Sequence, residues 1–361
     1  MFKQKRNILR VIDANGNRAC EGLRVVEDFS RFVWNDSSLS NRCKQLRHEL
    51  AECLQHEGFL GMVAMRESMG DVGRTIETGA EYDRTDAADI VKANLTRVQQ
   101  ATRSLEEFAK IFDIGTAKRF EQIRYCVYEL ESSFSIAQIG HDRLASSALY
   151  VLADATESDR VFRKRVASIT RPDVDGRSPV DIVQLRDKNV STQVLIDRCR
   201  TFRDVAAADT LLIVNDRPDV ASVVQADGVH LGQDDMAVHE ARTLVGPEML
   251  VGVSTHSAEQ VESAAHSGAN YIGVGPTFAS TTKTFSEFKG LGLLRSAAAI
   301  TSLPAFAIGG IDEHNVDQVA NAGFRRVAVS AAIWRSSDPG TAARQLRKRL
   351  SEKNAIVGDE K

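Results

Sequence analysis

The chain has 361 residues, of which 43% are hydrophobic and 26% charged, and its formal net charge is -3. These values are typical of a soluble globular protein, and the length predicts two domains that each bury their own core. The weak negative charge predicts no general attraction to nucleic acid or to an anionic membrane, so any anion site must be local.

Targeting signals and cysteine chemistry are not indicated. No apolar run approaches the ~20 residues of a membrane span, and the first residues lack the apolar core of a secretion signal. We therefore expect a cytoplasmic protein. The five cysteines are widely spread without a C-x-x-C pair, which predicts neither disulfides nor a zinc site.

Residues 1–140 are predicted to form an all-α domain, because apolar residues recur at helical spacing and glycine and proline are scarce. Residues 15–29 match residues 94–108 at one constant offset, and Leu46-Arg47 resembles Ile123-Arg124 in a following helix. The pattern predicts two related helical hairpins in a pseudo-symmetric bundle. Chance similarity between charged amphipathic helices is the alternative.

A glycine-rich segment, residues 65–82, separates the two copies. Its cations, hydroxyl and flexible amides predict an anion-binding loop with the residues Arg66, Ser68, Asp71, Gly73 and Arg74. The chain contains no G-x-x-x-x-G-K-[ST] motif, which argues against a P-loop kinase.

The stretches IDANGNRACEGLRVVEDFSRF and RESMGDVGR resemble the ThiD2 family, which occurs fused to or beside thiamine phosphate synthase. The resemblance implies either a hydroxymethylpyrimidine phosphate kinase or a scaffold that tethers or regulates the second domain. Kinase activity predicts ATP consumption that depends on residues such as Arg66 and Asp71, whereas a scaffold predicts exposed apolar helix faces.

Residues 146–350 change to short apolar runs separated by helical patterns. The eight runs are 149–152, 182–185, 211–214, 228–231, 250–253, 271–274, 305–308 and 326–329. This alternation predicts a (β/α)8 TIM barrel in an α/β chain. A doubly wound open sheet is the alternative. The barrel is favoured because polar residues follow many of the strands, without a G-x-G-x-x-G motif after the first.

Carboxylates follow the third and fourth predicted strands. Asn215 and Asp216 end the third, and Asp234 and Asp235 follow the fourth. Two carboxylates at neighbouring strand ends suit a hard cation that keeps several waters and takes a diphosphate as its other ligand, so we predict Mg²⁺ at Asp216 and Asp235. The alternative is that each aspartate caps the helix that follows it.

Cations and hydroxyls follow other strands. The second strand ends in QLRDK, the fifth in Ser254-Thr255-His256, and the sixth leads into GPTFASTTK, a candidate closing loop. Gly309-Gly310 and Ser330, after the seventh and eighth strands, predict a phosphate site, although each alone is a common turn or cap. His230 is predicted to be an interior residue rather than a metal ligand.

These features predict a metal-diphosphate site beside a monophosphate site, as a reaction joining a diphosphate ester to a phosphorylated nucleophile requires. Mg²⁺ neutralises the leaving diphosphate, and Arg186, Lys188 and Lys283 bind its oxygens. No nucleophile-His-Asp set is evident. If a stabilised carbocation forms, no strong general base is required.

The ordered motifs QLRDK, IVNDRPDVA, ADGVHLGQDDM, VGVSTHS, YIGVGPTFASTTK, AIGGI and VAVSAAI, over residues 149–334, resemble thiamine phosphate synthase. The family joins 4-amino-2-methyl-5-hydroxymethylpyrimidine diphosphate to 4-methyl-5-(2-hydroxyethyl)thiazole phosphate. The resemblance implies a dissociative path through a pyrimidine carbocation. The related thiazole tautomerases are the alternative, but they need no metal or diphosphate grip.

The resemblance implies catalytic roles for Arg186, Lys188, Ser254 and Lys283. The substrate contacts it implies are Gln184, Leu185, Arg186, Asp187, Lys188, Asn215, Ser254, Ser280, Thr281, Thr282, Lys283, Gly310, Val329 and Ser330. The chain departs from the family at the loop after the sixth strand, where Ala279-Ser280 replaces the usual proline-threonine start. Ser280 keeps a hydroxyl, so we expect activity to be retained. The expected partners are small-molecule substrates and, as an open possibility, further copies of the chain.

Overall fold

The computed structural model describes residues 2–67, 84–154, 158–186, 189–279 and 290–358. The chain divides into two compact units, Met1–Phe134 and Ser135–Lys361. The sequence placed the boundary between residues 140 and 146, whereas the units meet within helix α4 (Ile114–Leu144). Among the described helices, none is both long and apolar enough to span a bilayer.

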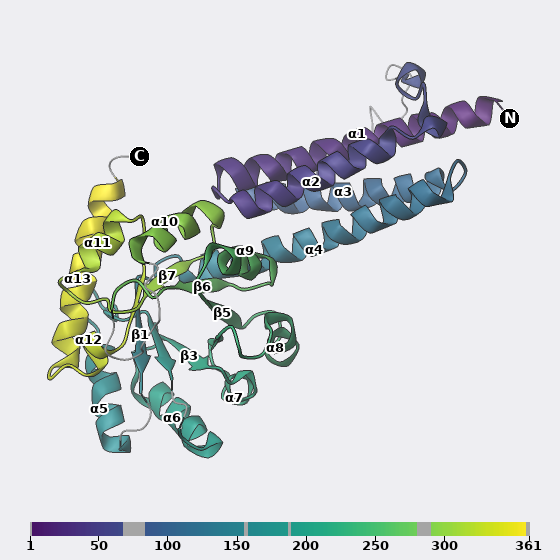
Figure 1. The fold of residues 1–361 in the computed structure, drawn as a ribbon. Coiled ribbons are helices and arrows are strands. Elements are labelled where there is room, and N and C mark those ends of the chain that lie inside the picture. The colour runs from purple at the N-terminus through teal and green to yellow at the C-terminus, as the bar shows by residue number, and fades with distance from the viewer. Residues whose placement is uncertain (1, 68–83, 155–157, 187–188, 280–289, 359–361) are drawn as a thin grey trace. The chain divides into compact units, whose positions relative to one another are not determined.

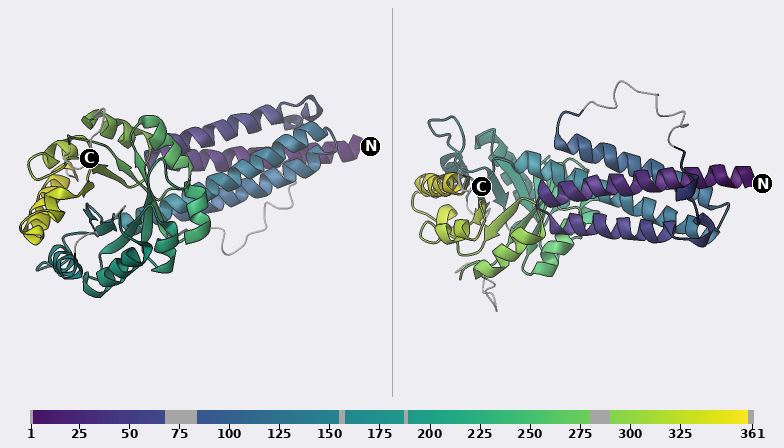
Figure 2. Two further views of the ribbon diagram at one scale, coloured as in Figure 1. Left: turned by 60° about the horizontal axis from the view of Figure 1, so that its bottom comes forward. Right: turned by 90° about the horizontal axis from the view of Figure 1, so that it is seen from above.

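Long helices lying side by side form the described part of the first unit (Figures 1 and 2). Its elements are α1 (Phe2–Phe32), α2 (Ser37–Leu54), η1 (Glu57–Phe59), η2 (Val63–Met65), α3 (Ala87–Ala109) and the first part of α4. Helix α1 packs against both α2 and α3. It buries Ile12, Ala19, Leu23 and Val26, whose spacing puts them on one helical face.

In each of the two helix pairs of this unit, the second helix begins with the same kind of capping contact. Asp36 Oδ1 accepts a hydrogen bond from Leu39 N at 2.8 Å before α2, and Asp113 Oδ2 accepts one from Thr116 N at 2.6 Å before α4. Each cap satisfies an amide at a helix start that has no partner inside the helix. The matching sequence segments therefore enter their second helices in the same way.

Eight parallel strands close into a barrel in the second unit, in the order β1 to β8 with β8 paired to β1. The strands are β1 (Leu149–Ala153), β2 (Ile182–Leu185), β3 (Leu211–Asn215), β4 (Gly228–Leu231), β5 (Leu250–Thr255), β6 (Tyr271–Val274), β7 (Ala305–Ile308) and β8 (Val327–Val329). Every predicted run overlaps its strand, which confirms the TIM barrel. The open-sheet alternative is wrong, because the β1–β8 pairing leaves no sheet edge.

Helices follow the strands and cover the outside of the barrel (Figure 1). The described helices are α5 (Asp159–Ile169), α6 (Thr192–Val205), α7 (Pro218–Val223), α8 (Val238–Val245), α9 (Ala258–His266), α10 (Gly290–Ile300), α11 (Val316–Asn321), α12 (Ala331–Trp334) and α13 (Pro339–Gly358). The strands are buried on both faces, as a parallel sheet beneath helices requires.

Side chains fill the inside of the barrel. Tyr150, Tyr271 and Phe306 are almost completely buried there, with their ring centroids 5.3–6.1 Å apart. Gly252 makes this packing possible, because a Cβ at that position would come within 2.0 Å of the Tyr271 ring. The interior is thus a packed core, and a ligand must bind at an end of the barrel.

The C-terminal end of α4, from Ser135, closes the N-terminal end of the barrel. Leu144 belongs to the buried cluster inside the barrel, and Ile139 packs against it. Asn270, just before β6, donates from Nδ2 to Ile136 O at 2.9 Å. A Cβ at Gly140 would come within 2.2 Å of Asn270 O, so the helix passes very close to the loop. The C-terminal ends of the strands are therefore the open side.

Candidate active site

The carboxyl ends of the barrel strands bring several predicted site residues together. Asn215 pairs with His230 across β3 and β4, and Ser254 pairs with Gly273 across β5 and β6. Gln184 and Val329 lie at the matching ends of β2 and β8. The predicted residues Asp187, Lys188, Ser280, Thr281, Thr282 and Lys283 lie outside the described residues.

A chain of hydrogen bonds crosses the barrel interior beneath this end. Gln184 Nε2 donates to Tyr150 Oη at 2.8 Å, and Tyr150 Oη lies 3.2 Å from Tyr271 Oη. Tyr271 Oη lies 3.2 Å from His230 Nδ1, and His230 Nε2 lies 2.9 Å from Ser254 Oγ. The chain joins two predicted substrate contacts, Gln184 and Ser254, through three residues that sequence reasoning did not place together.

The charge states of this chain follow from its burial. Desolvation raises the pKa of Tyr271 well above its usual value, so its hydroxyl stays protonated. Burial, with the nearby Arg186 cation, lowers the pKa of His230 to about 4, although Asp235 raises it slightly. Both effects disfavour the charged imidazolium, so His230 is neutral at pH 7.

A neutral His230 carries one ring proton, and its neighbours decide which nitrogen holds it. Tyr150 accepts from Gln184, and among the described residues of this chain its own hydroxyl proton finds an acceptor when it is donated to Tyr271; we infer that the Tyr271 hydroxyl in turn donates to His230 Nδ1. The proton then sits on Nε2 and is donated to Ser254 Oγ. The Ser254 hydroxyl proton is then not used by His230 and can be donated to a ligand.

Gln184 also offers an acceptor. The residue is only 2% exposed, and its Oε1 atom has no hydrogen-bond donor among the described residues. A buried acceptor without a partner costs about 1–3 kcal/mol. This cost is removed if a ligand donates an N–H to Oε1. The contact suits an amino group on a ligand ring that binds at the C-terminal end of the barrel.

Asp216 and Asp235 follow β3 and β4, which are neighbours in the barrel. Asp216 has φ of 59°, a left-handed conformation that aspartate tolerates better than most residues, and its N donates to His230 O at 2.8 Å. Asp235 Oδ2 accepts from Gly232 N at 2.8 Å, which orients its carboxylate. No cluster of three or more His, Cys, Asp or Glu side chains suited to a metal occurs among the described residues.

This donor set fits Mg²⁺ in one particular way. Two hard carboxylates are too few to enclose a cation, but Mg²⁺ keeps several waters and takes substrate phosphate oxygens beside one or two carboxylates. Neither aspartate occupies the N-cap position of the following helix, which is held by Arg217 for α7 and by Ala237 for α8. The helix-cap alternative for these residues is therefore wrong.

Backbone geometry shapes the end of β7. Gly309 and Gly310 have φ of 102° and 64°, and a Cβ at Gly310 would come within 2.3 Å of Ala279 O. Phe278 N donates to Gly309 O at 2.9 Å. The two glycines therefore lie against the segment after β6, directly before the predicted loop residues.

Ser330 occupies the cap position of the short helix α12, but its side chain makes no capping bond. Its hydroxyl donates to Leu152 O at 3.3 Å across the β8–β1 seam. His256, which follows β5, lies with Nδ1 2.6 Å from Gly275 O and so contacts the backbone after β6. Gln233, not singled out from sequence as a contact, donates from Nε2 to Ser254 O at 2.6 Å.

The predicted anion loop of the first unit begins with a strong ion pair. Arg66 donates through Nε and Nη2 to both oxygens of Asp13, at 2.6 and 2.9 Å, and Asp13 is only 5% exposed. This bidentate contact fastens the start of the loop to α1. The other predicted loop residues, Ser68, Asp71, Gly73 and Arg74, lie outside the described residues.

Comparisons with known proteins match both units. The thiamine monophosphate synthase family matches residues 149–333, and the ThiD2 family matches residues 10–133. Thiamine-phosphate synthase of Rhodopirellula baltica is 41% identical over 340 residues, covering 91% of this chain and 89% of that protein. The chain belongs to the thiamine-phosphate synthase family.

Further relatives include a thiamine-phosphate synthase that matches over almost its full length and a shorter solved structure. The Synechocystis protein of that name is 38% identical over 348 residues, covering 96% of this chain and 97% of its own. Thiamine phosphate pyrophosphorylase from Pyrococcus furiosus, a solved structure, is 31% identical with a TM-score of 0.50, covering 57% of this chain and 96% of that one. These names favour the synthase over the thiazole tautomerase.

Proposed function

We propose that the barrel unit condenses 4-amino-2-methyl-5-hydroxymethylpyrimidine diphosphate with 4-methyl-5-(2-hydroxyethyl)thiazole phosphate, giving thiamine phosphate and diphosphate. The observation that carries this proposal is the polar chain from Gln184 to Ser254, because it offers an acceptor for a ring amino group at one end and a hydroxyl donor for an anion at the other. The names of the full-length relatives support the same reaction.

The proposed chemistry needs positioning rather than a strong base. The bond between the pyrimidine methylene carbon and the diphosphate oxygen breaks with its electron pair on oxygen, and the thiazole nitrogen lone pair forms the new C–N bond. Gln184 orients the pyrimidine ring, and Ser254 donates to the departing diphosphate. Arg186 lies near enough to influence His230 and supplies positive charge at the same end of the barrel.

Asp216 and Asp235 would hold Mg²⁺ beside the diphosphate in this proposal. The bound cation would supply positive charge that balances the charge gathering on the leaving group. Gly310, Val329 and Ser330 remain the proposed contacts of the thiazole phosphate. Since no proton must be removed from carbon or nitrogen, neutral His230 serves only to orient Ser254.

The test is a synthase assay with both substrates and Mg²⁺, following thiamine phosphate and diphosphate. Asp216→Asn and Asp235→Asn should each lower kcat/KM at least ~100-fold, about 2.7 kcal/mol of transition-state stabilisation. Asparagine is preferred because it also tolerates the left-handed backbone at position 216. Asp234→Asn, an exposed neighbour, is the matched control and should change the rate less than threefold.

Removal of Mg²⁺ with EDTA should abolish product, and added Mg²⁺ should restore it. A second readout is independent of turnover: diphosphate should raise the melting temperature of the wild type only when Mg²⁺ is present, and of neither Asp variant. A folded wild type that forms no product with both substrates and Mg²⁺ refutes the synthase proposal. Equal loss in all three Asp variants refutes the metal assignment.

A further inference from the structure

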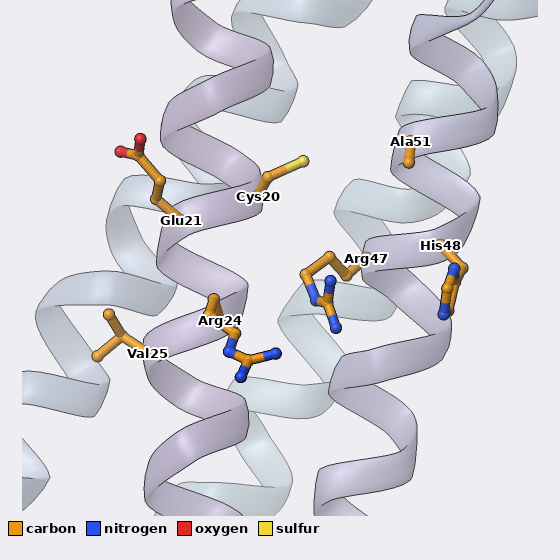
Figure 3. Close-up of a pocket in the computed structure, with 7 residues that line it drawn as sticks. All are labelled: Cys20, Glu21, Arg24, Val25, Arg47, His48 and Ala51. Atoms are coloured by element: carbon orange, nitrogen blue, oxygen red, sulfur yellow. The ribbon is translucent and has the colours of Figure 1, made fainter.

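A solvent-open groove lies between α1 and α2 in the first unit, and none of its lining residues belongs to the barrel unit that holds the residues of the proposed reaction. Its volume is about 470 Å³, and it is lined by Cys20, Glu21, Arg24, Val25, Arg47, His48 and Ala51. Figure 3 shows Arg24 and Arg47 reaching into the space between the two helices. Arg47 donates through Nε and Nη2 to Glu27 Oε2 at 3.1 and 2.9 Å, and Arg24 lies 3.8 Å from the same carboxylate.

The repeat within this unit supplies a second copy of the same arrangement. Glu106 on α3 corresponds to Glu27, and its Oε2 accepts from Arg124 Nε at 3.0 Å, while Arg103 lies 2.7 Å from its Oε1. The asparagines of the two copies also make the same bond, from Asn15 Nδ2 to Val11 O and from Asn94 Nδ2 to Ile90 O. The two copies can therefore be compared position by position.

The two copies differ in the side chains that cover the arginine of the second helix, which is Arg47 on α2 in the first copy and Arg124 on α4 in the second. His48 and Ala51 on α2 correspond to Tyr125 and Tyr128 on α4. The Arg124 guanidinium lies 4.8 and 5.5 Å from the two tyrosine ring centroids, and its Nη1 donates to Tyr128 Oη at 3.1 Å. The second copy thus places two aromatic rings on its guanidinium and gives it a phenol oxygen as acceptor.

The first copy has the same guanidinium without that cover. Arg47 has no ring against it and no acceptor for Nη1 among the described residues, and 27% of its side chain is exposed, against 10% for Arg124. A guanidinium face and one aligned donor are therefore presented to solvent at the place that the tyrosines fill in the other copy. Stacking a ring on such a face contributes about 0.5–2 kcal/mol.

We propose that this groove binds a small molecule with a flat aromatic ring and an oxygen acceptor, which stacks on Arg47 and accepts a hydrogen bond from its Nη1. The ligand takes the place that two tyrosine side chains hold in the second copy. The volume lies within the ~300–1,000 Å³ of small-molecule sites. Seven lining residues are far fewer than the ~20–30 on one side of a protein interface.

The charges around the groove favour a neutral ring over a polyanion. Arg24 and Arg47 face three carboxylates, Glu21 in the lining and Glu27 and Asp28 bound to the arginines. A phosphate would meet no excess of positive charge there. Burial raises the pKa of the Cys20 thiol, so that wall of the groove is uncharged as well.

The first experiment measures binding of p-cresol, the tyrosine side-chain analogue, to the full chain by ligand-observed NMR. Toluene, which has the same ring without oxygen, is the matched probe. We expect p-cresol to bind the wild type at least threefold more tightly than toluene, because only p-cresol accepts from Arg47 Nη1. No p-cresol binding to the wild type, or equal binding of both probes, overturns the proposal.

Two double variants place the binding in the groove. His48→Tyr with Ala51→Tyr gives the first copy the rings of the second and should weaken p-cresol binding at least tenfold without lowering the melting temperature. Tyr125→His with Tyr128→Ala uncovers Arg124 and should add a second p-cresol site. Unchanged binding in the first variant overturns the proposal, as does unchanged stoichiometry in a folded second variant. Formation of thiamine phosphate in the barrel should not change in either.

Discussion

Replacing Tyr271 with phenylalanine tests the proton order in the barrel interior. The Tyr271 hydroxyl lies 3.2 Å from both Tyr150 Oη and His230 Nδ1, and the residue is completely buried. Its removal leaves a buried donor on Tyr150 and a buried acceptor on His230 without partners. At about 1–3 kcal/mol for each of these two groups, we expect the free energy of unfolding to fall by about 2–6 kcal/mol.

The same change acts on the active site through the histidine tautomer. Without a donor at Nδ1, the His230 proton can move to Nδ1, and Nε2 then accepts from Ser254 instead of donating to it. The Ser254 proton turns inward, and the diphosphate loses a hydrogen bond of about 1.5–3 kcal/mol, so kcat/KM should fall about 10- to 100-fold. Urea unfolding, the synthase assay and ¹⁵N NMR of the histidine ring nitrogens measure these three effects.

Tyr150→Phe is the matched control, since it removes a buried hydroxyl from the same chain but leaves the Tyr271 donor in place. It should cost similar stability and keep the proton of His230 on Nε2. If Tyr271→Phe also keeps the proton on Nε2, the reasoning from hydrogen-bond direction to tautomer is refuted, whatever happens to the rate.

Three further predictions concern stability and are measured by urea unfolding. As the pH falls from about 6.5 to 4, the contribution of His230 should lower the free energy of unfolding by up to about 3 kcal/mol. The reason is that the histidine of the unfolded chain takes up a proton, while the buried one, with a pKa of about 4, stays neutral. The variant His230→Gln should lack this part of the pH dependence. Gly310→Ala should lower the free energy of unfolding by more than about 2 kcal/mol, because its Cβ would come within 2.3 Å of a backbone oxygen. Gly176→Ala should lower it by only about 1 kcal/mol, because Gly176 also has a positive φ but no atom lies within 4 Å of the added Cβ. Glu106→Gln should lower the free energy of unfolding by about 3 kcal/mol, and by more than Glu27→Gln does. The reason is that Arg124, the partner of Glu106, is less exposed than Arg47, the partner of Glu27; equal losses in the two variants would contradict this ranking.

The barrel could be predicted from sequence because its strands are short apolar runs bounded by polar residues, a signal carried by each run alone. Four predicted runs, including Gly228–Leu231 and Tyr271–Val274, have the bounds of their strands. Ends differ by one or two residues elsewhere, as at β8, which begins at Val327 rather than Arg326. The order of the strands around the barrel then follows from the right-handed connection between successive parallel strands.

The interior hydrogen-bond chain could not be predicted in the same way. It joins Tyr150, Tyr271, His230 and Ser254, which lie on β1, β6, β4 and β5 and meet only when the barrel closes. The available signal was a tyrosine at an inward-facing position of two strands, but a buried tyrosine needs only some partner, not a particular one. His230 was correctly placed in the interior, and its two partners were not.

The end of α4 packs against the barrel, and this contact limits how recombination can exchange the two modules of such a chain. The N-terminal end of the barrel is closed by the last part of α4, which precedes every strand. Its residues Ile139 and Leu144 pack against the core, and its Ile136 O accepts a hydrogen bond from Asn270. A gene that began at residue 146 would encode all eight strands with the apolar end of their core in water. A new partner module can therefore replace the first one without loss only if it leaves this last part of the helix, from Ser135, with the barrel.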